Sequence, residues 1–276
     1  MTIYLAEKGI SDIEVVEVEF PHRPELWPEG FLLKLNPAHS LPVLDTGKGA
    51  LIGQSIAILE YLRELYPSPN MLGETPEEHA QARELVSIFE EATAFFGIWA
   101  RQGGRLNADR HRTSAEAAEV GAERFATKLR VAETRLIGPF LSGAAITIAD
   151  CVAMALIEFA DQFYDVSLPP DRPKLTAWYR RMRRRPSTRA PTYPEALLVV
   201  ARGLPSKPRC SSSSSTTARE VATRRVWCEL ASMRSTTIDI YHYISVADCT
   251  LLYPTLLHST PRHSHSIVRN NGNALI

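Results

Sequence analysis

The chain has 276 residues, and its 31 lysine and arginine residues are balanced by 31 aspartate and glutamate residues. A formal net charge of zero gives no global attraction to nucleic acid or to an anionic membrane, so small molecules or proteins are the expected partners. No apolar run approaches the roughly 20 residues that span a bilayer, and no secretory leader pattern opens the chain, which predicts a soluble, cytoplasmic protein.

The first residues predict a fold element that mixes helix and strand. A short helix is expected to end at Gly9, which suits a left-handed cap, and the apolar run over residues 13–20 predicts a strand. The stretch "LPVLDTGKGALIG" predicts two antiparallel strands joined by a turn from Asp45 to Gly49. A helix then begins near Ser55, with Ile58, Leu62 and Leu65 on one apolar stripe, and ends before Pro67. These elements form a first domain at residues 1–68.

Residues 76–190 are predicted to be helical throughout. Apolar residues recur at spacings of three and four over residues 85–99 and 118–136, as in amphipathic helices that pack against each other. The stretch "TIADCVAMALIEFADQF" is apolar on nearly every side, which places it at the centre of a bundle. Thr147 and Asp150 supply a capping signal at its start, with the aspartate reaching back to the cap amide.

The composition changes again over residues 203–276. The run "CSSSSSTTAREVATRR" is rich in serine, and no hydrophobic period persists beyond it, which predicts a low-complexity, disordered tail. A metal site is the alternative for His258, His263 and His265, and the disordered tail is the favoured interpretation. The four cysteines form no C-x-x-C pair, so no metal site is expected elsewhere.

Three stretches, taken in order, resemble the soluble glutathione transferase family: "NPAHSLPVL", "GQSIAILEYL" and "SGAAITIADCVAMALIEF". The resemblance covers about residues 5 to 190 and also includes "KLTAWYRRMRRRPS". It implies an α+β fold, with a thioredoxin-like N-terminal domain that binds glutathione and an all-helical C-terminal domain that shapes the pocket of a second substrate. It also implies a homodimer. Glutathione would be a co-substrate, with no bound cofactor and no metal.

The resemblance assigns roles to individual residues. Pro42 matches the cis-proline of the family, and the backbone of Val43 would pair with the cysteinyl backbone of glutathione as an added strand does. Gln54 and Ser55 match the pair that grips the γ-glutamyl end, where a helix N-terminus suits a carboxylate. For Ser55 the alternative is a plain N-cap. His39 matches a position that holds the glycyl carboxylate in some classes, and a surface histidine is the equal alternative.

The sequence departs from the family at its start. Family members have a strand and a loop with an activating Tyr, Ser or Cys before this helix, and neither is present here. Tyr4 lies too close to the helix end to belong to that loop, so the catalytic residue stays unassigned. We expect roughly 15 to 20 residues to be missing in front. Misassigned exon boundaries would explain both this truncation and the tail.

Three functions follow from the resemblance. The first is conjugation of glutathione to an electrophilic small molecule, for detoxification or for tailoring a secondary metabolite. The second is a non-catalytic binding or regulatory module, which the absent activating loop favours. The third is glutathione-dependent isomerase or lyase chemistry on the same fold.

Overall fold

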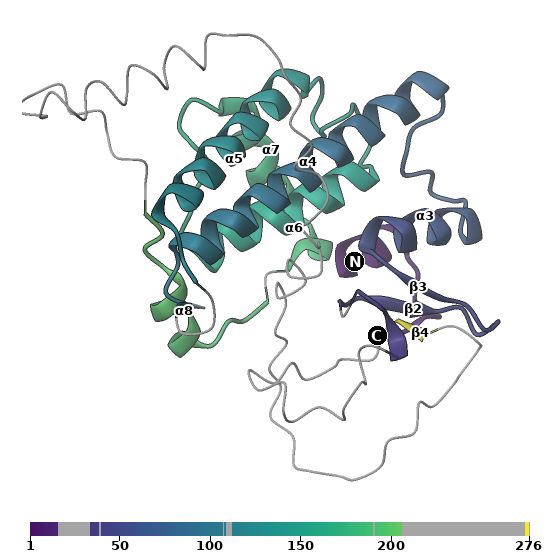
Figure 1. Cartoon of the computed structure of the whole chain (residues 1–276). Coiled ribbons are helices and arrows are strands. Elements are labelled where there is room, and N and C mark those ends of the chain that lie inside the picture. The colour runs from purple at the N-terminus through teal and green to yellow at the C-terminus, as the bar shows by residue number, and fades with distance from the viewer. Residues whose placement is uncertain are drawn as a thin grey trace, which may run out of the picture. The chain divides into compact units, whose positions relative to one another are not determined.

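The computed structural model describes residues 1–15, 34–38, 40–106, 108, 112–189 and 191–205, together with the backbone of residues 274–275. A small sheet with helices comes first along the chain, and a bundle of helices follows it (Figure 1). The predicted α+β class, with a thioredoxin-like part before an all-helical part, is confirmed.

Helix α1 (Thr2–Lys8) ends where the sequence predicted. Gly9 takes a left-handed conformation, with φ of 67°. The amide of Ile10 donates to the carbonyl of Leu5 at 2.9 Å and closes the last turn. Although α1 has only 7 residues, the side chains of Ile3, Tyr4 and Leu5 are buried in the core. Tertiary packing therefore stabilises a helix that is too short to be stable alone.

The predicted hairpin is present and antiparallel. Strand β2 (Val43–Asp45) pairs with strand β3 (Leu51–Gly53), and the turn between them contains two glycines with positive φ. Helix α3 (Ser55–Leu65) follows at once. The predicted apolar stripe of α3 is partly wrong, because Leu65 is 42% exposed. The buried face of α3 instead consists of Ile58, Leu59 and Leu62.

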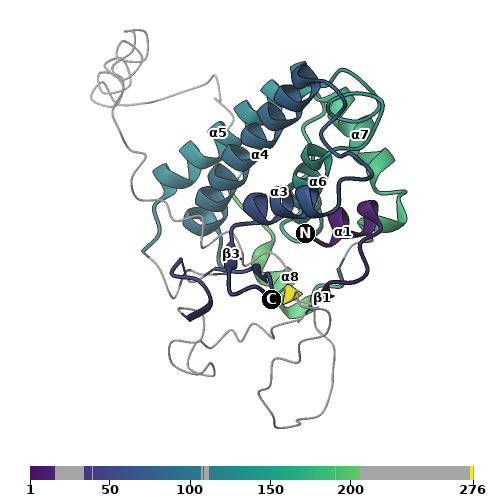
Figure 2. The same cartoon turned by 90° about the vertical axis from the view of Figure 1, so that its right-hand side faces the viewer.

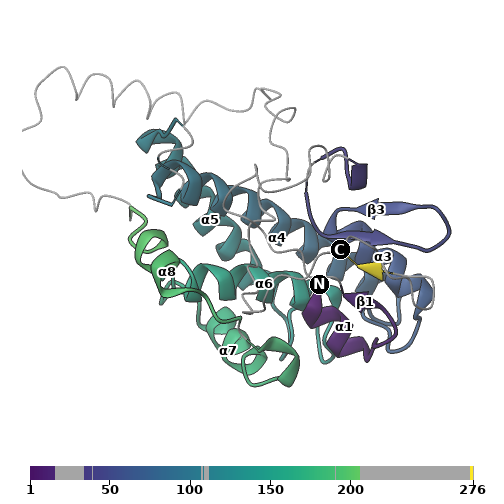
Figure 3. The same ribbon diagram turned by 90° about the horizontal axis from the view of Figure 1, so that it is seen from below.

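The sheet takes one strand from the far end of the chain. Its order is β1-β4-β2-β3, where β1 is Glu14–Val15 and β4 is Ala274–Leu275. Strand β4 runs parallel to β1 and antiparallel to β2. Figure 3 shows β4 as the yellow arrow close to β1. Two residues of the predicted tail thus take part in the N-terminal sheet, while residues 206–273 lie outside the described part.

The helical part follows the predicted pattern closely. Helices α4 (Pro76–Gly103), α5 (Ala115–Arg135), α6 (Ile148–Gln162) and α7 (Pro173–Met182) cover the stretches that the periodicity marked. A 3-10 helix, η2 (Pro186–Thr188), and helix α8 (Glu195–Ala201) come next. Helix α8 was not predicted. Among the described helices, none combines the length and the apolar character needed to cross a membrane.

Helices α4 and α5 lie side by side, as Figure 2 shows. A side chain at Gly121 would meet the backbone of Trp99 at 2.7 Å, so the glycine permits the close approach of the two helices. Phe96 is 2% exposed and packs against rings from α4, α5 and α6. Phe96 is therefore a core residue.

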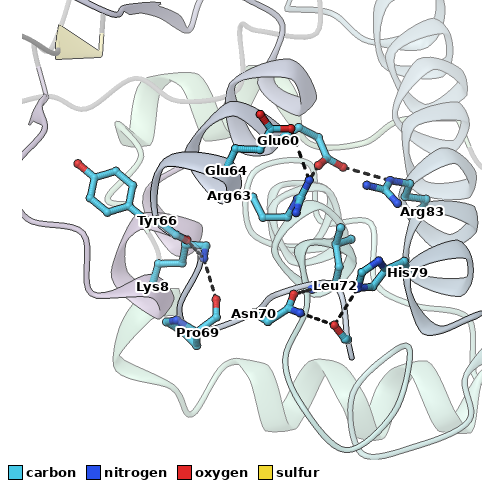
Figure 4. A network of polar contacts seen from close by, with 11 residues as sticks. Lys8, Glu60, Arg63, Glu64, Tyr66, Pro69, Asn70, Leu72, His79 and Arg83 are labelled. Atoms are coloured by element: carbon cyan, nitrogen blue, oxygen red, sulfur yellow. Dashed lines mark hydrogen bonds and ion pairs between the residues drawn. The ribbon is translucent and has the colours of Figure 1, made fainter. Parts of the chain in front are cut away.

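The segment between α3 and α4 is held by polar contacts on both sides (Figure 4). Lys8 of α1 donates to the carbonyls of Tyr66 and Pro69 at 2.6 and 2.7 Å. At the other end of the segment, Asn70 and His79 both contact the carbonyl of Gly73. This segment therefore has a fixed path, because several of its main-chain carbonyls accept hydrogen bonds.

Candidate functional site

The loop that leads into β2 is fixed by one asparagine. The side-chain amide of Asn36 donates to both the carbonyl and the hydroxyl of Ser40 at 2.9 Å, and its oxygen accepts from the amide of Ala38 at 3.0 Å. A side chain at Gly53 would meet this amide at 2.9 Å. Asn36 therefore packs directly against the end of β3 and holds the shape of the loop by its hydrogen bonds.

Sequence reasoning did not single out Asn36, although the residue opens the quoted stretch "NPAHSLPVL". A signal was available, because Asn-Pro is a typical turn initiator. The Leu41–Pro42 peptide bond is cis, as the resemblance implied for Pro42. His39 lies outside the described residues, so its predicted contact with a glycyl carboxylate stays a prediction.

Hydrogen bonding along the hairpin orients the backbone of Val43. The amide of Thr46 donates to the carbonyl of Ala50 at 3.0 Å. Antiparallel pairs alternate between hydrogen-bonded and non-hydrogen-bonded, so the pair of Leu44 and Ile52 is bonded and that of Val43 and Gly53 is not. The amide and carbonyl of Val43 consequently point away from β3. They face the edge of β2 along which β4 pairs with Leu44 and Asp45, and the whole residue is buried.

Gln54 has the most unusual conformation of the site. Its φ is 67° and its ψ is 120°, a region that residues other than glycine rarely occupy. Gln54 follows directly on Gly53, the partner of Val43 in the hairpin. The register thus brings Val43, Gln54 and Ser55 together at one end of the hairpin. Backbone strain at a residue of this kind is typical of functional sites.

The beginning of α3 offers free donors to a ligand. Gln54 is its N-cap and makes no side-chain cap hydrogen bond, while the first intrahelical bond runs from the amide of Ile58 to the Gln54 carbonyl at 3.1 Å. The amides before Ile58 therefore have no intrahelical partner. No acidic residue stands in the first turn, so the positive end of the helix dipole is not neutralised there. Ser55 is half-buried and Gln54 is exposed.

Two nucleophilic groups elsewhere in the chain are excluded as activators of a bound thiol. Tyr4 is fully buried, its hydroxyl has no hydrogen-bond partner among the described residues, and burial raises the pKa of its phenol. Cys151 is 4% exposed, and burial likewise raises the pKa of its thiol. Neither side chain reaches solvent, where a ligand at α3 would lie.

Thr147 and Asp150 lie in the helical bundle and have a structural part there. They form the capping box of α6, in which the amide of Thr147 donates to Asp150 at 2.8 Å. The other carboxylate oxygen of Asp150 accepts from the amide of Leu141 and from the indole of Trp178 at 2.9 and 2.7 Å. Asp150 thus connects α6 with the preceding loop and with α7.

Comparison with known proteins places the chain in a family. Models of the glutathione S-transferase N-terminal and C-terminal domains match residues 1–65 and 110–181. Glutathione S-transferase F14 of Arabidopsis thaliana is 30% identical over 192 residues, which cover 66% of this chain and 73% of the plant protein. The chain belongs to the glutathione S-transferase family.

Three further matches extend this comparison. Glutathione S-transferase 2 of Saccharomyces cerevisiae is 28% identical over 198 residues, or 68% of this chain and 81% of the yeast protein. The crystal structure of Gtt2 from the same yeast superimposes with a TM-score of 0.56 at 25% identity, covering 68% of this chain and 91% of Gtt2. Maleylacetoacetate isomerase of Rattus norvegicus is 42% identical over 87 residues, or 31% of this chain and 39% of the isomerase.

Proposed function

We propose that this chain binds glutathione at the end of the β2–β3 hairpin and conjugates it to an electrophilic small molecule. One observation carries the proposal: the open N-terminus of α3, with Gln54 and Ser55, directly follows Gly53, the hairpin partner of Val43. An extended peptide would pair with the backbone of Val43 as an added strand does, at a residue that is buried in the structure. Detoxification or the tailoring of a metabolite is the proposed physiological role, in the cytoplasm.

The carboxylate of the γ-glutamyl group would lie at the beginning of α3. Free amides and the positive end of the dipole favour an anion there. The hydroxyl of Ser55 adds a donor, and the exposed side chain of Gln54 adds a second. Such hydrogen bonds to a charged group contribute about 1.5–3 kcal/mol each. Pro42 and Val43 would position the cysteinyl unit, and His39 is the proposed partner of the glycyl carboxylate.

The chemical step requires the thiolate of glutathione. A free thiol with a pKa near 8.5 is only a few per cent ionised at neutral pH. Because Tyr4 and Cys151 are buried, no described residue is assigned to thiol activation. We therefore expect the chain to bind glutathione but to catalyse its conjugation slowly. We further propose that the chain forms a homodimer, as the resemblance implies.

The test compares Ser55→Ala with Ser87→Ala, a serine exposed on α4. Titration calorimetry with glutathione measures binding, and circular dichroism confirms that each variant is folded. We expect Ser55→Ala to weaken binding about tenfold, the equivalent of about 1.4 kcal/mol, and Ser87→Ala to leave it unchanged. If both variants bind glutathione as tightly as the parent chain, Ser55 does not contribute to the binding site. A parent chain that is folded and binds no glutathione would overturn the proposal.

Glutathione-dependent isomerisation is the second candidate. The similarity to maleylacetoacetate isomerase favours it, since identity over that segment is higher than with the plant and yeast transferases. An isomerase releases a product without glutathione attached, and a transferase releases a conjugate. Mass analysis of products from a generic aromatic chloride and from a cis-olefinic dicarboxylic acid distinguishes the two. Glutathione binding without turnover of either would indicate a binding module.

A further inference from the structure

We propose that Ser187 is a phosphorylation site for a protein kinase with an acidic substrate groove, and that a phosphate there breaks the contact between α1 and η2. The sequence over residues 183–188 is Arg-Arg-Arg-Pro-Ser-Thr. Arginines therefore stand two and three residues before the serine hydroxyl, and kinases of this class select substrates by basic side chains in front of the acceptor. This inference is independent of glutathione binding.

The basic run around Ser187 has no acidic residues near it in the sequence. Residues 172–194 contain eight lysine and arginine residues and no aspartate or glutamate. Arg183 and Arg184 are exposed, and neither takes part in an ion pair within the part of the chain that the structure describes. A guanidinium group without an ion-pair partner can form bidentate contacts with the carboxylates of an acidic groove. Arg184, three residues before Ser187, is thus available for recognition by a kinase.

Ser187 is the more accessible of the two hydroxyl residues in η2. Its side chain is half-buried, whereas Thr188 is 4% exposed and its hydroxyl donates to the carbonyls of Met182 and Arg185 at 2.6 and 3.0 Å. A 3-10 helix of three residues is held by few hydrogen bonds, so it can open locally without unfolding of the core. Local opening would present the hydroxyl of Ser187 to the kinase.

The modification itself is a phosphoryl transfer from a nucleoside triphosphate bound by the kinase. A bond forms between Oγ of Ser187 and the γ-phosphorus, and the bond from that phosphorus to the oxygen that bridges it to the β-phosphate breaks. The nucleoside diphosphate leaves, and the proton of the hydroxyl passes to the catalytic base of the kinase. The product is a phosphoserine that carries a charge of about −1.5 to −2 at neutral pH.

This charge would lie against a carboxylate. The hydroxyl of Ser187 donates to Glu7 of α1, whose side chain is 8% exposed and accepts both hydrogen bonds from Arg185. A phosphate on this oxygen removes the donated proton, repels the carboxylate and competes with it for the guanidinium. Since Glu7 connects α1 with the segment after α7, we expect phosphorylation to release α1 from η2.

A kinase assay on the full chain tests the site. The catalytic subunit of cyclic-AMP-dependent protein kinase, with ATP and Mg²⁺, is the probe, and tandem mass spectrometry of peptides locates the phosphate. We expect one phosphate on Ser187, and none in that peptide of Ser187→Ala. Arg184→Gln should slow its incorporation about tenfold, the equivalent of one hydrogen bond to a charged group.

The matched control is Arg180→Gln, at an arginine that is also exposed and stands seven residues before the serine. This variant should be phosphorylated as fast as the parent chain. Phosphate found only on other residues of the folded parent chain would overturn the assignment of the site. Equal rates for Arg184→Gln and Arg180→Gln would overturn the recognition by the arginine run.

Hydrogen exchange tests the release of α1. Phosphorylation should make the amides of α1 exchange about tenfold faster, as expected for the loss of one charged contact, and should leave those in the middle of α4 unchanged. In Glu7→Gln the phosphate meets no carboxylate and can pair with Arg185, so the acceleration should disappear. Ser187→Asp compared with its neutral counterpart Ser187→Asn gives the same test without the kinase or the Glu7 variant. Equal exchange of α1 in these two variants, or equal acceleration in Glu7→Gln and the parent chain, would overturn the release mechanism.

Discussion

The carboxylate of Glu7, in α1, and the guanidinium of Arg185, directly before η2, form a bidentate ion pair. Arg185 donates through Nε at 2.6 Å and through a terminal nitrogen at 2.7 Å, and the hydroxyl of Ser187 contacts the same carboxylate. The side chain of Glu7 is 8% exposed. The pair connects the first helix of the chain with the segment that follows α7, across 178 positions of sequence.

A double-mutant cycle measures the coupling energy between Glu7 and Arg185. We expect Glu7→Gln and Arg185→Gln each to lower the free energy of unfolding, with a coupling energy of about 1–3 kcal/mol, because a bidentate pair at a partly buried site is stronger than a surface pair. Urea unfolding followed by circular dichroism gives the four values. Arg184→Gln, at an exposed residue, is the control and should change stability little.

The pH dependence of the same pair follows from the pKa of Glu7. The hydrogen bonds from Arg185 lower this pKa below its ordinary value of 4.5, against the opposing effect of burial. A carboxyl with a lowered pKa in the folded chain stabilises the fold above its unfolded pKa and loses that contribution as pH falls. The stability difference between the parent chain and Glu7→Gln should therefore shrink from pH 7 to pH 4. A constant difference would contradict the assignment.

The contribution of Glu158 to stability changes with pH in the opposite direction from that of Glu7. It is 2% exposed in α6, its Oε1 has no hydrogen-bond partner among the described residues, and burial raises its pKa to about 7. Between pH 4.5 and 7 the folded chain holds a proton that the unfolded chain has released, so stability falls as pH rises through this range. We expect Glu158→Gln to stabilise the fold by about 2–3 kcal/mol at pH 8 and to change it little at pH 4.

Thermal unfolding at both pH values checks this prediction. Glu119→Gln, at an exposed residue of α5, is the control and should change stability little. If Glu158→Gln is as stable as the parent chain at pH 8, the carboxylate of Glu158 is solvated or paired in the folded state, and the prediction is wrong.

Asp150 holds several elements through a single side chain. Replacing it with alanine leaves the amides of Leu141 and Thr147 and the indole of Trp178 without their acceptor. Each unsatisfied buried donor costs about 1–3 kcal/mol, so we expect Asp150→Ala to lower the unfolding free energy by several kcal/mol. Chemical denaturation measures the loss, with Glu119→Ala as control. A loss below 1 kcal/mol would show that water replaces the carboxylate.

The sequence predicted the helices and the hairpin well because their signals are local. Gly9 ended α1, Asp45 to Gly49 made the turn, and the apolar period of α4 to α6 matched the buried faces. The capping role of Asp150 was also readable, whereas its bond to Trp178, 28 residues away, was not. Contacts of this kind depend on how helices pack, and no local pattern encodes them.

The site was predictable only in part for the same reason. The resemblance named Val43, Gln54 and Ser55, and the hairpin register then explains in physical terms why they meet. Asn36 escaped notice because its contact with Gly53 arises from the loop path. Strand β4 was not predictable either, since pairing between residues 15 and 275 leaves no periodic signal in a two-residue strand.

Two variants of Gln54 should distinguish the effect of its backbone conformation on stability from the effect of its side chain on ligand binding. Glycine accepts a positive φ without strain, whereas other residues there cost about 1–3 kcal/mol. We therefore expect Gln54→Gly to raise the unfolding free energy by about 1 kcal/mol, and Gln54→Ala, which keeps the strain, to leave it unchanged. Both variants remove the side-chain donor, so both should weaken glutathione binding by a similar factor, measured by calorimetry. Equal stability of the two variants would mean that the backbone at this position relaxes without cost. If both variants bind glutathione as tightly as the parent chain, the side chain of Gln54 contributes nothing to binding. The strained backbone at Gln54 would then act only by positioning Ser55 at the beginning of α3.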